Sequence, residues 1–390
     1  MMATKKSNGE DSINRYKNGW RGTITIGRNS DGKLIRKQVY GKTKLETIEK
    51  MNEYKDKNKR GLIPKNDKIT LNEWFKTWLF DFKANEVKAS TIQRYDVIYR
   101  NYVESSEIGG IKLKDLNSIT IQNYYNNLTK LGKAPITIKI LNKAIKSCLK
   151  YAKKMNYIIE NCCDNVVLPK IPYKGEDKVQ VFTVEEQKRF MEVIKNHKHR
   201  IEFLLTLGTG LRIGELVALK WNDIDFENGS LRVNKSIWRG YVTIDGKRKY
   251  VIQETAPKTP SSIREVAIPD KILEELKIHK EKQDEIKERY KEIYNDKSYV
   301  FANIIGEQML SDTLSKSFAK ALKDNGIKHV KFHSMRHSYA TRLFEKGVQL
   351  KTVQKLLGHS SIEITADIYT HVMNSEKISA VQKLNDLFEE

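Results

Sequence analysis

The sequence predicts a multidomain chain that is mainly α-helical and carries small β-sheets. Three observations support this prediction. The 390 residues exceed the usual size of one domain, so two or three domains are expected. Strand-like alternation of apolar residues is confined to the N-terminal region and to residues 225–269. Elsewhere apolar residues recur at the three- and four-residue spacing of a helix face.

Two linker-like segments divide the chain into three predicted domains. Residues 1–61 are expected to form a small β-sheet with a helix, residues 68–168 a helical bundle, and residues 176–390 an α+β domain. Residues 61–68 form the first linker, and the second contains Pro169 and Pro172 among charged residues. With 39% hydrophobic residues, the chain has enough apolar side chains for ordinary cores.

The formal net charge of +22 points to a polyanionic partner, most simply nucleic acid. A membrane surface is the alternative, but no apolar run is long enough to span a bilayer and no signal peptide opens the chain. The three cysteines, Cys148, Cys162 and Cys163, lack metal-ligand spacing. We therefore expect a protein of the bacterial cytoplasm with reduced structural thiols and no bound metal.

The N-terminal 60 residues hold sixteen Lys and Arg against seven Asp and Glu, a net charge of +9. Strands are predicted over Trp20–Gly27 and Leu34–Tyr40, joined by a turn at Asn29–Gly32. Thr43 and Glu46 form a capping box that predicts a helix to about Lys57. The module is either a DNA-binding unit or a charged appendage. The candidate DNA contacts are Arg21, Arg28, Lys33, Arg36 and Lys37.

The next domain is predicted to contain four helices with continuous apolar faces. They begin near Leu71, at a capping box of Ser90 to Gln93, near Thr120 and near Ile136. The aromatic stripe of the first helix, which includes Trp74 and Trp78, is expected in the core rather than stacked on bases.

The C-terminal domain opens with a helix capped by Thr183 and then carries a first motif, Leu205–Trp221. An apolar helix ends at a glycine turn, and a second helix places Arg212 and Glu215 on one face. An arginine just after such a turn suits a phosphate, together with backbone N–H groups. Alone, such a pair is usually an ordinary helix salt bridge.

Three strands are predicted next, over 231–237, 250–255 and 264–268. Lys258 lies in the connection between the last two, where a lysine is usually only solvated. The helices predicted over 271–296 and 311–325 are expected to be structural.

The last motif brings together four reactive side chains. His333 and Arg336 share one helix face, and His359 precedes Tyr369 by ten residues. Arginine binds phosphate oxygens with two N–H groups, and histidine exchanges protons near neutral pH. A tyrosine beside such groups is a candidate nucleophile. Separately, each feature is common and has an ordinary structural explanation.

Together the motifs closely resemble the tyrosine recombinases. Thr-Gly-Leu-Arg-Ile-Gly-Glu-Leu at 209–216 matches the family's first arginine motif, and Lys-Thr-Pro-Ser-Ser-Ile-Arg at 258–264 resembles its β-hairpin lysine. His-Ser-Met-Arg-His, Leu-Gly-His-Ser and Asp-Ile-Tyr-Thr-His then follow in the family's order. The resemblance implies an arm-binding domain, a helical core-binding (SAM-like) domain and a catalytic domain, in that order.

The resemblance also implies the catalytic residues and their roles. Tyr369 would attack a DNA phosphate to give a 3′-phosphotyrosyl link. The supporting catalytic groups would be Arg212 and Arg336 on the phosphate oxygens, His333 and His359 beside them, Lys258 as general acid, and Glu215 orienting Arg212. Neither a cofactor nor a metal is implied.

The function implied is that of a site-specific integrase of a prophage or an integrative conjugative element. Its partners would be double-stranded DNA at core and arm attachment sites, in a homotetramer, with an excision factor and a host DNA-bending protein as accessory partners. Three alternatives remain: a chromosome-dimer resolvase, a type IB topoisomerase and a non-catalytic architectural protein. The basic N-terminal module argues against the resolvase, and the complete catalytic set argues against the architectural protein.

A short apolar face follows the tyrosine, formed by Ile378, Val381, Leu384 and Leu387. It predicts a terminal helix that packs either on its own domain or on a neighbouring protomer.

Overall fold

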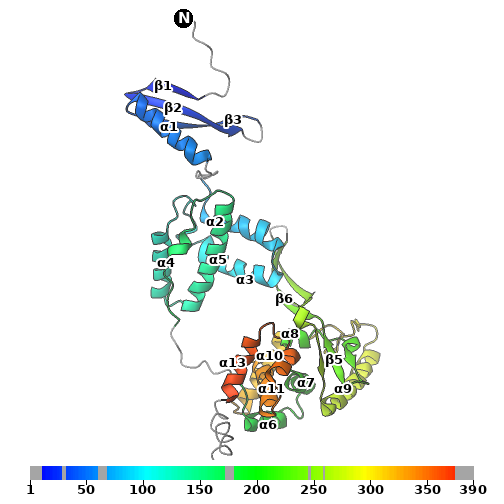
Figure 1. The fold of residues 1–390 in the computed structure, drawn as a ribbon. Helices are drawn as coiled ribbons and strands as arrows, with labels where there is room; N and C mark the ends of the chain where they lie inside the picture. The colour runs from blue at the N-terminus through cyan, green and yellow to red at the C-terminus, as the bar shows by residue number, and fades with distance from the viewer. Residues whose placement is uncertain are drawn as a thin grey trace, which may run out of the picture. The chain divides into compact units, whose positions relative to one another are not determined.

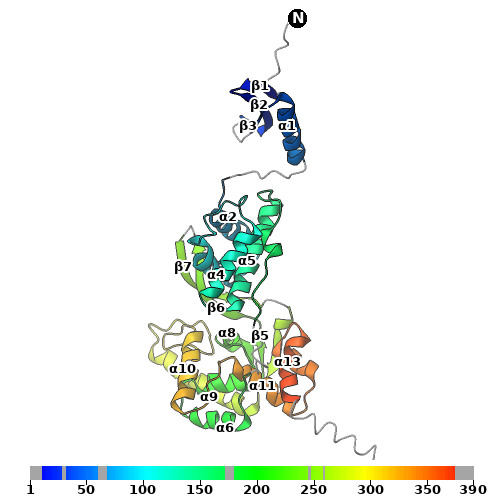
Figure 2. The same cartoon turned by 90° about the vertical axis from the view of Figure 1, so that its left-hand side faces the viewer.

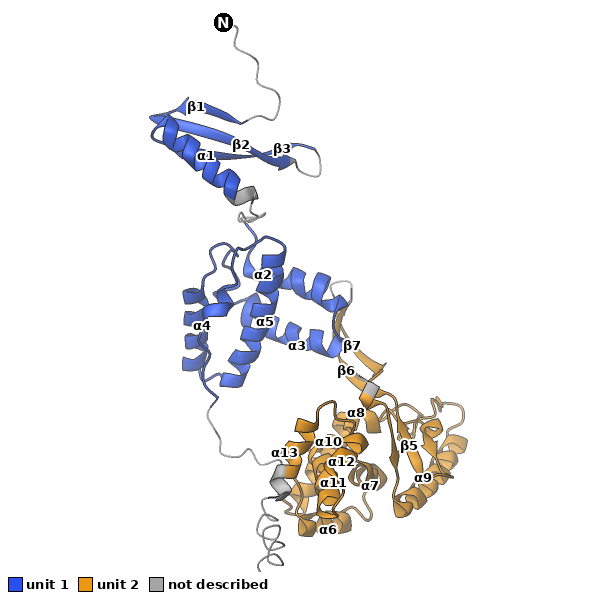
Figure 3. Cartoon of the chain, viewed as in Figure 1, with its two compact units in different colours: residues 1–172 blue, residues 173–390 orange. Residues whose placement is uncertain are grey.

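The computed structural model describes residues 11–28, 32–59, 68–171, 180–244, 247–257 and 260–373. The chain divides into two compact units, Met1–Pro172 and Tyr173–Glu390 (Figure 3). The predicted terminal helix after Tyr369 lies outside the described residues. Among the residues described, no helix is both long enough and apolar enough to cross a membrane.

The N-terminal module is a three-stranded antiparallel sheet in the order β1-β2-β3, with α1 across one face (Figure 1). Its elements are β1 (Ser12–Tyr16), β2 (Gly19–Arg28), β3 (Leu34–Gly41) and α1 (Lys44–Lys59). Ile24 and Met51 are buried, and a Cβ on Gly22 would lie 2.3 Å from the Met51 sulfur. The glycine therefore lets the helix approach the sheet. β1 was not predicted, because its short polar sequence has too little apolar alternation.

The predicted capping of α1 is only partly confirmed. Thr43 Oγ1 accepts a hydrogen bond from the Glu46 backbone N–H at 3.1 Å. The Glu46 carboxylate reaches one residue further back than expected and accepts the Lys42 backbone N–H at 2.7 Å. Both bonds satisfy N–H groups at the start of the helix.

The rest of the first unit is helical, and it has one continuous core. Its main helices are α2 (Leu71–Thr77), α3 (Ala89–Tyr99), α4 (Ser118–Lys130) and α5 (Pro135–Lys154). α2 and α3 each continue into a π-helical turn, Trp78–Phe82 and Arg100–Glu104. The capping box predicted at Ser90 is wrong, since α3 begins at Ala89 and Lys88 is its N-cap without a side-chain bond.

The aromatic stripe of α2 is core, as predicted. Trp74, Phe75 and Trp78 are buried, and the Trp74 indole donates to the Cys148 carbonyl at 3.1 Å. Burial of each such side chain contributes about 2 kcal/mol or more to stability. The three cysteines are free thiols and all buried, which agrees with a structural role.

The described residues of the second unit form eight α-helices packed around one large and one small core. They are α6 (Val184–Val193), α7 (Arg200–Thr209), α8 (Ile213–Leu216), α9 (Asp270–Arg289), α10 (Ser311–Asp324), α11 (Ser334–Glu345), α12 (Leu350–Leu357) and α13 (Ile362–Met373). The capping box predicted at Thr183 is confirmed, with Glu186 as its partner. α11 lies inside the unit (Figure 2). It packs on α7, α12 and α13.

In the described part of the second unit, five strands form two separate sheets. One has the order β4-β5-β8, and the other is the hairpin β6-β7. The strands are β4 (Ile224–Asp225), β5 (Ser230–Val233), β6 (Ser236–Ile244), β7 (Lys247–Thr255) and β8 (Arg264–Ala267). The single strand predicted over 231–237 is wrong. Asn234 and Lys235 both bind Asp223, and these bonds end β5 before the chain enters the hairpin.

Candidate active site

The site begins where α7 ends. Gly210 closes α7 in the left-handed conformation, with φ of 65°. A Cβ at this position would lie 2.5 Å from a ring carbon of Tyr339, so the close approach of α11 requires glycine. Two residues later Arg212 occupies the N-cap of α8. The predicted helix end at the glycine turn is thus confirmed, and it places Arg212 beside α11.

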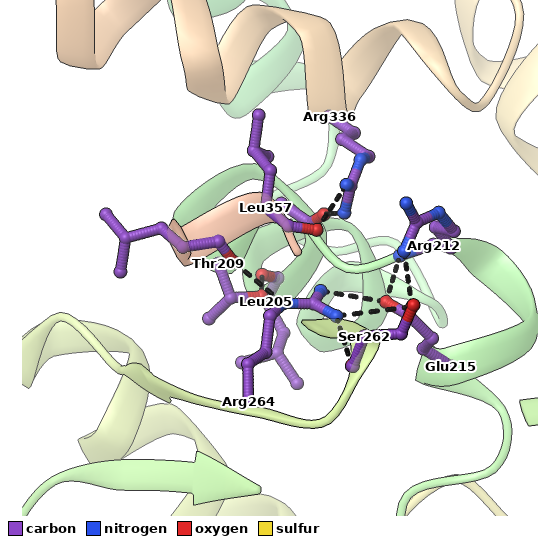
Figure 4. Close-up of polar contacts among 10 residues, drawn as sticks. Leu205, Thr209, Arg212, Glu215, Ser262, Arg264, Arg336 and Leu357 are labelled. Atoms are coloured by element: carbon purple, nitrogen blue, oxygen red, sulfur yellow. Dashed lines mark hydrogen bonds and ion pairs between the residues drawn. The ribbon is translucent and has the colours of Figure 1, made fainter. Parts of the chain in front are cut away.

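Glu215 binds two arginines at once (Figure 4). Its carboxylate accepts Arg212 Nη1 at 2.7 Å and the Arg212 backbone N–H at 3.0 Å. It also accepts Arg264 Nη2 at 2.9 Å and Arg264 Nη1 at 3.3 Å. Burial alone would raise the pKa of Glu215, but Arg264 and Arg212 outweigh burial and lower it to about 2. The carboxylate is therefore ionised at any physiological pH.

Arg336, in the first turn of α11, is 1% exposed. Its Nη1 donates to the Gly210 carbonyl at 2.6 Å, and its Nη2 donates to the Leu357 carbonyl (Figure 4). These carbonyls close α7 and α12, so one guanidinium joins two helix ends. Burial, followed by the charges of Arg212 and Arg264, lowers the pKa of Arg336 to about 9. The side chain stays cationic at neutral pH.

His333 precedes α11, and its ring lies 4.7 Å from that of His337 between centroids. His333 is exposed, yet its ring is packed closely enough for desolvation to lower its pKa. The charges of His337, Arg336 and Arg212 add to this effect, and the pKa falls to about 4. His333 is therefore neutral at pH 7 and able to accept a proton.

His359 follows the left-handed Gly358 that caps α12, and it is buried. Its Nδ1 lies 2.9 Å from Thr365 Oγ1 on α13. Burial and then the charges of Arg336 and Arg212 lower its pKa to about 3. If the Thr365 hydroxyl donates to Nδ1, then Nε2 carries the proton and is a hydrogen-bond donor.

Tyr369 lies on α13, one turn after Thr365. Its ring packs edge-on against Phe344 of α11, with centroids 4.9 Å apart. Within the described part of the chain its hydroxyl makes no hydrogen bond. Phe344 is two helical turns, roughly 12 Å, along α11 from Arg336.

The structure thus brings Arg212, His333, Arg336 and His359 together. Arg336 follows His333 by three residues, and it binds the carbonyls of Gly210 and Leu357, which lie two residues before Arg212 and His359. Tyr369 is joined to them through Thr365. Lys258 lies outside the described residues.

Two contributors were missed from the sequence, Arg264 and Thr365. Arg264 stands in the quoted Lys-Thr-Pro-Ser-Ser-Ile-Arg segment, but its partners are 49 and 92 residues away. Thr365 carries a weak signal, because it precedes Tyr369 by four residues on one helix face.

An open pocket of about 370 Å³ adjoins this cluster between the approach to β8 and α12. Arg264 and His359 line it, together with the exposed Lys351 and Lys355. Glu265 is the one carboxylate of this lining, so the two lysines leave the pocket with a net positive charge.

The β6-β7 hairpin adds a second exposed basic surface. Tyr241 and Tyr250 are cross-strand partners, and the Arg248 guanidinium lies 4.0 Å from the Tyr241 ring centroid. Lys247 and Lys249 flank Arg248 and are exposed. The hairpin starts against α8, where a Cβ on Gly214 would lie 2.6 Å from Ser236 Oγ.

In the N-terminal module, the strand register separates the candidate DNA contacts. Arg21 pairs with Tyr40 and Thr25 pairs with Arg36, which places both arginines on the sheet face opposite α1. Lys37 pairs with the buried Ile24 and so belongs to the α1 face. Lys33 is exposed before β3, and the Arg28 side chain lies outside the described residues.

Comparison with known proteins agrees with this geometry. The model of the phage integrase family matches residues 180–376, and that of the phage integrase N-terminal SAM-like domain matches residues 70–129. A tyrosine recombinase XerC-like protein of Caldanaerobacter subterraneus subsp. tengcongensis is 45% identical over 386 residues, which are 96% of this chain and 98% of that protein. The chain belongs to the phage integrase family.

This integrase is a tyrosine site-specific recombinase, and solved structures share its fold. The Tn1549 transposon integrase in complex with a circular intermediate DNA has a TM-score of 0.64 at 20% identity, covering 81% of this chain and 99% of that one. A lambda integrase tetramer bound to a Holliday junction has a TM-score of 0.53 at 20% identity, covering 93% and 96%. The predicted fold class, a mainly helical multidomain chain with small sheets, is confirmed.

Proposed function

We propose that this integrase breaks and rejoins DNA through Tyr369 to integrate and excise a mobile element. The supporting observation is that Arg336, beside His333 on α11, binds the two segments that carry Arg212 and His359, and that Tyr369 lies on the helix that binds His359. Guanidinium groups fixed before the reaction stabilise the charge that builds on phosphate oxygens in the transition state.

In the proposed step, the Tyr369 oxygen attacks the scissile phosphorus and forms a P–O bond. The bond from phosphorus to the 5′-oxygen breaks, leaving a 3′-phosphotyrosyl link and a 5′-hydroxyl. The tyrosine proton passes to His333, and Lys258 gives a proton to the leaving oxygen. The 5′-hydroxyl of a partner duplex then attacks the link and restores a phosphodiester.

The electrostatics of the free protein are compatible with these roles. His333 is neutral at pH 7, as a proton acceptor must be. The arriving phosphate adds negative charge beside Arg212 and Arg336, so it raises the pKa of both histidines toward 7. His359 with its proton on Nε2 would donate to a phosphate oxygen, and Thr365 would fix that tautomer.

The remaining surfaces suit DNA at two kinds of site. The hairpin and the basic pocket belong to the catalytic domain, and we assign them to the core site. The residue 1–61 module, with Arg21 and Arg36 on its open face, is assigned to a separate arm site. The helical domain at 68–168 would bind the core site together with the catalytic domain. Four cleavages on two duplexes require four protomers. An excision factor and a host DNA-bending protein would assist this assembly in the bacterial cytoplasm.

Trapping the covalent intermediate tests the proposal. Half-sites are first selected from a randomised duplex library with the Tyr369→Phe variant, which lacks only the hydroxyl. A selected half-site is then nicked near the cleavage position, so that the 5′-hydroxyl fragment diffuses away. The native protein should form a complex that survives denaturation, with DNA attached to Tyr369 by mass spectrometry. Absence of this adduct in the native protein, or its persistence in Tyr369→Phe, overturns the proposal.

Two-site substrates separate recombination from relaxation. A pair of full sites on separate duplexes should yield exchanged products. A type IB topoisomerase would relax supercoils without pairing sites, and an architectural protein would leave both duplexes intact.

A further inference from the structure

Arg264 is the most fully bonded side chain of the site, and the reaction outlined above gives it no role. It opens β8, and its side chain is 5% exposed. Nε donates to the Leu356 carbonyl at 2.7 Å, and Nη1 and Nη2 donate to the two oxygens of Glu215 at 3.3 and 2.9 Å. Nη1 also approaches the Ser262 carbonyl at 3.4 Å. Its N–H groups therefore point into the protein rather than toward DNA.

We propose that Arg264 is a positioning residue that shares Glu215 with Arg212 and thereby leaves Arg212 charged toward the scissile phosphate. This inference rests on the proposed function. Arg264 would not touch the phosphate itself, because its donors are committed to Glu215 and to backbone carbonyls.

The charge balance of the cluster supports this role. Arg212, Arg264 and Arg336 contribute three positive charges, and among the described residues Glu215 is the carboxylate that acts on all three. With Arg264 present, one negative charge is divided between two guanidinium groups. Without it, Glu215 would pair with Arg212 alone, and the phosphate would meet an almost neutral ion pair.

Exposure supports the same division of labour between the two arginines. The Arg212 side chain is 37% exposed, against 5% for Arg264, so of these two arginines it is Arg212 that presents its guanidinium to an incoming phosphate. Arg212 uses Nη1 for Glu215, and its other side-chain N–H groups make no bond within the described residues. Arg264 thus serves as the buried counter-ion and Arg212 as the accessible one.

Arg264 also fixes the approach to His359. It binds the Leu356 carbonyl, while Arg336 binds the next one along, Leu357. A Cβ on Gly358 would lie 3.0 Å from Arg264 Cδ, so the side chain packs directly on the turn that leads to His359. Arginine suits this place better than lysine, which cannot hold a carboxylate and a carbonyl in a planar fork.

The test uses Arg264→Gln, Glu215→Gln and the double variant, with Arg212→Lys as the reference for a damaged phosphate contact. The cleavage rate of each variant is measured on two forms of the selected half-site. One form has a normal scissile phosphate, and the other has a methylphosphonate, which lacks the non-bridging negative charge. Melting temperature and half-site affinity are measured in parallel. Cleavage of the normal phosphate by the native protein establishes the proposed function separately, so failure of that function is distinguishable from failure of this inference.

Arg264→Gln should cleave the normal phosphate about 100-fold more slowly than the native protein, but the methylphosphonate only a few-fold more slowly. Adding Glu215→Gln should restore about tenfold, because the carboxylate no longer neutralises Arg212. A structural role alone predicts equal losses on both substrates and losses that add in the double variant, and that result overturns the inference. If Arg264→Gln does not fold, the double variant decides. Cleavage within about tenfold of the native rate supports charge sharing, and a loss as deep as that of Arg212→Lys refutes it.

Discussion

The arginine and histidine cluster and the nucleophile are held in very different ways. Arg336 and Arg264 are buried, and each donates to fixed partners in two or three segments of the chain. Tyr369 has a ring contact with Phe344, and its hydroxyl makes no hydrogen bond within the described residues. The proposed phosphate-binding arginines are built into the core, whereas the proposed nucleophile is held by apolar packing.

This difference indicates that the fold fixes the proposed phosphate-binding groups before DNA binds, but does not fix the tyrosine hydroxyl. Donors that are fixed before the reaction cost no reorganisation when charge develops on the phosphate. A nucleophile held only through its ring is free to take its polar partners from DNA. The following predictions test the contrast, from the largest expected effect to the smallest.

Arginine-to-lysine substitutions should show how much each arginine contributes to the stability of the fold as well as to cleavage. Both Arg336→Lys and Arg212→Lys should slow cleavage about 100-fold or more, because lysine cannot reproduce the two-pronged contact. Only Arg336→Lys should also lower the free energy of unfolding, by about 3 kcal/mol, because the buried Gly210 and Leu357 carbonyls lose donors. Urea unfolding and single-turnover cleavage measure the two effects. Equal stability of the two variants would contradict the contrast.

Acid should destabilise the cluster through His359. Its pKa is about 3 in the folded protein, below the usual value near 6.5, so the unfolded chain binds the proton first as pH falls. The contribution of neutral His359 to the free energy of unfolding is therefore fully present above pH 6.5 and is lost as the pH falls toward 3. Between pH 7 and pH 5 this one group should cost about 2 kcal/mol. Urea unfolding of His359→Gln should show that much less acid destabilisation. An unchanged pH dependence would mean that His359 is not buried as described.

Thr365→Val tests the polar link between the cluster and the tyrosine helix. The change replaces a hydroxyl with a methyl group and keeps the side-chain volume nearly constant, so the lost hydrogen bond should cost about 1 kcal/mol of stability. Cleavage should slow roughly fivefold, because His359 loses the partner that fixes its tautomer. Thr365→Ser keeps the hydroxyl and should cleave like the native protein. A Thr365→Ser variant as slow as Thr365→Val would assign the effect to packing.

Phe344→Leu should have the smallest effect. A substitution that conserves much of the volume should cost about 1 kcal/mol of stability. If the contact with Phe344 holds the Tyr369 ring without positioning its hydroxyl for attack, the single-turnover cleavage rate should change by less than about threefold. A drop as large as that of Arg212→Lys would show that the ring contact itself positions the nucleophile, and would break the contrast drawn above.

Local features of the fold were predictable from the sequence, and long-range ones were not. The helix end at Gly210 and the capping box at Thr183 depend on neighbouring residues, and both were predicted. The end of β5 depends on Asp223, which binds Asn234 and Lys235 from more than ten residues away. The π-helical turn at Trp78–Phe82 was not predicted, because the apolar spacing of this segment is that of a continuing helix.

The candidate site divides in the same way. Five of its six proposed catalytic residues are described, and four of these meet in one cluster. Arg264 could not be identified from spacing, because its role depends on Glu215 and Leu356, which only the folded chain brings near. Residues proposed to contact DNA could therefore be predicted from the sequence, whereas a residue that positions other side chains, such as Arg264, could not.

Arg336 joins the C-terminal ends of α7 and α12, and this has a consequence for binding equilibria. A helix carries about half a negative charge at its C-terminus. The dipoles of the two helix ends offset the positive charge of the Arg336 guanidinium. Unlike a carboxylate on a mobile side chain, these dipoles cannot move away or take up a proton. An anion that binds there adds to these interactions rather than displacing them. Because it binds only the folded state, sulfate or phosphate should raise the melting temperature of the DNA-free protein, by an amount that grows with the logarithm of the anion concentration.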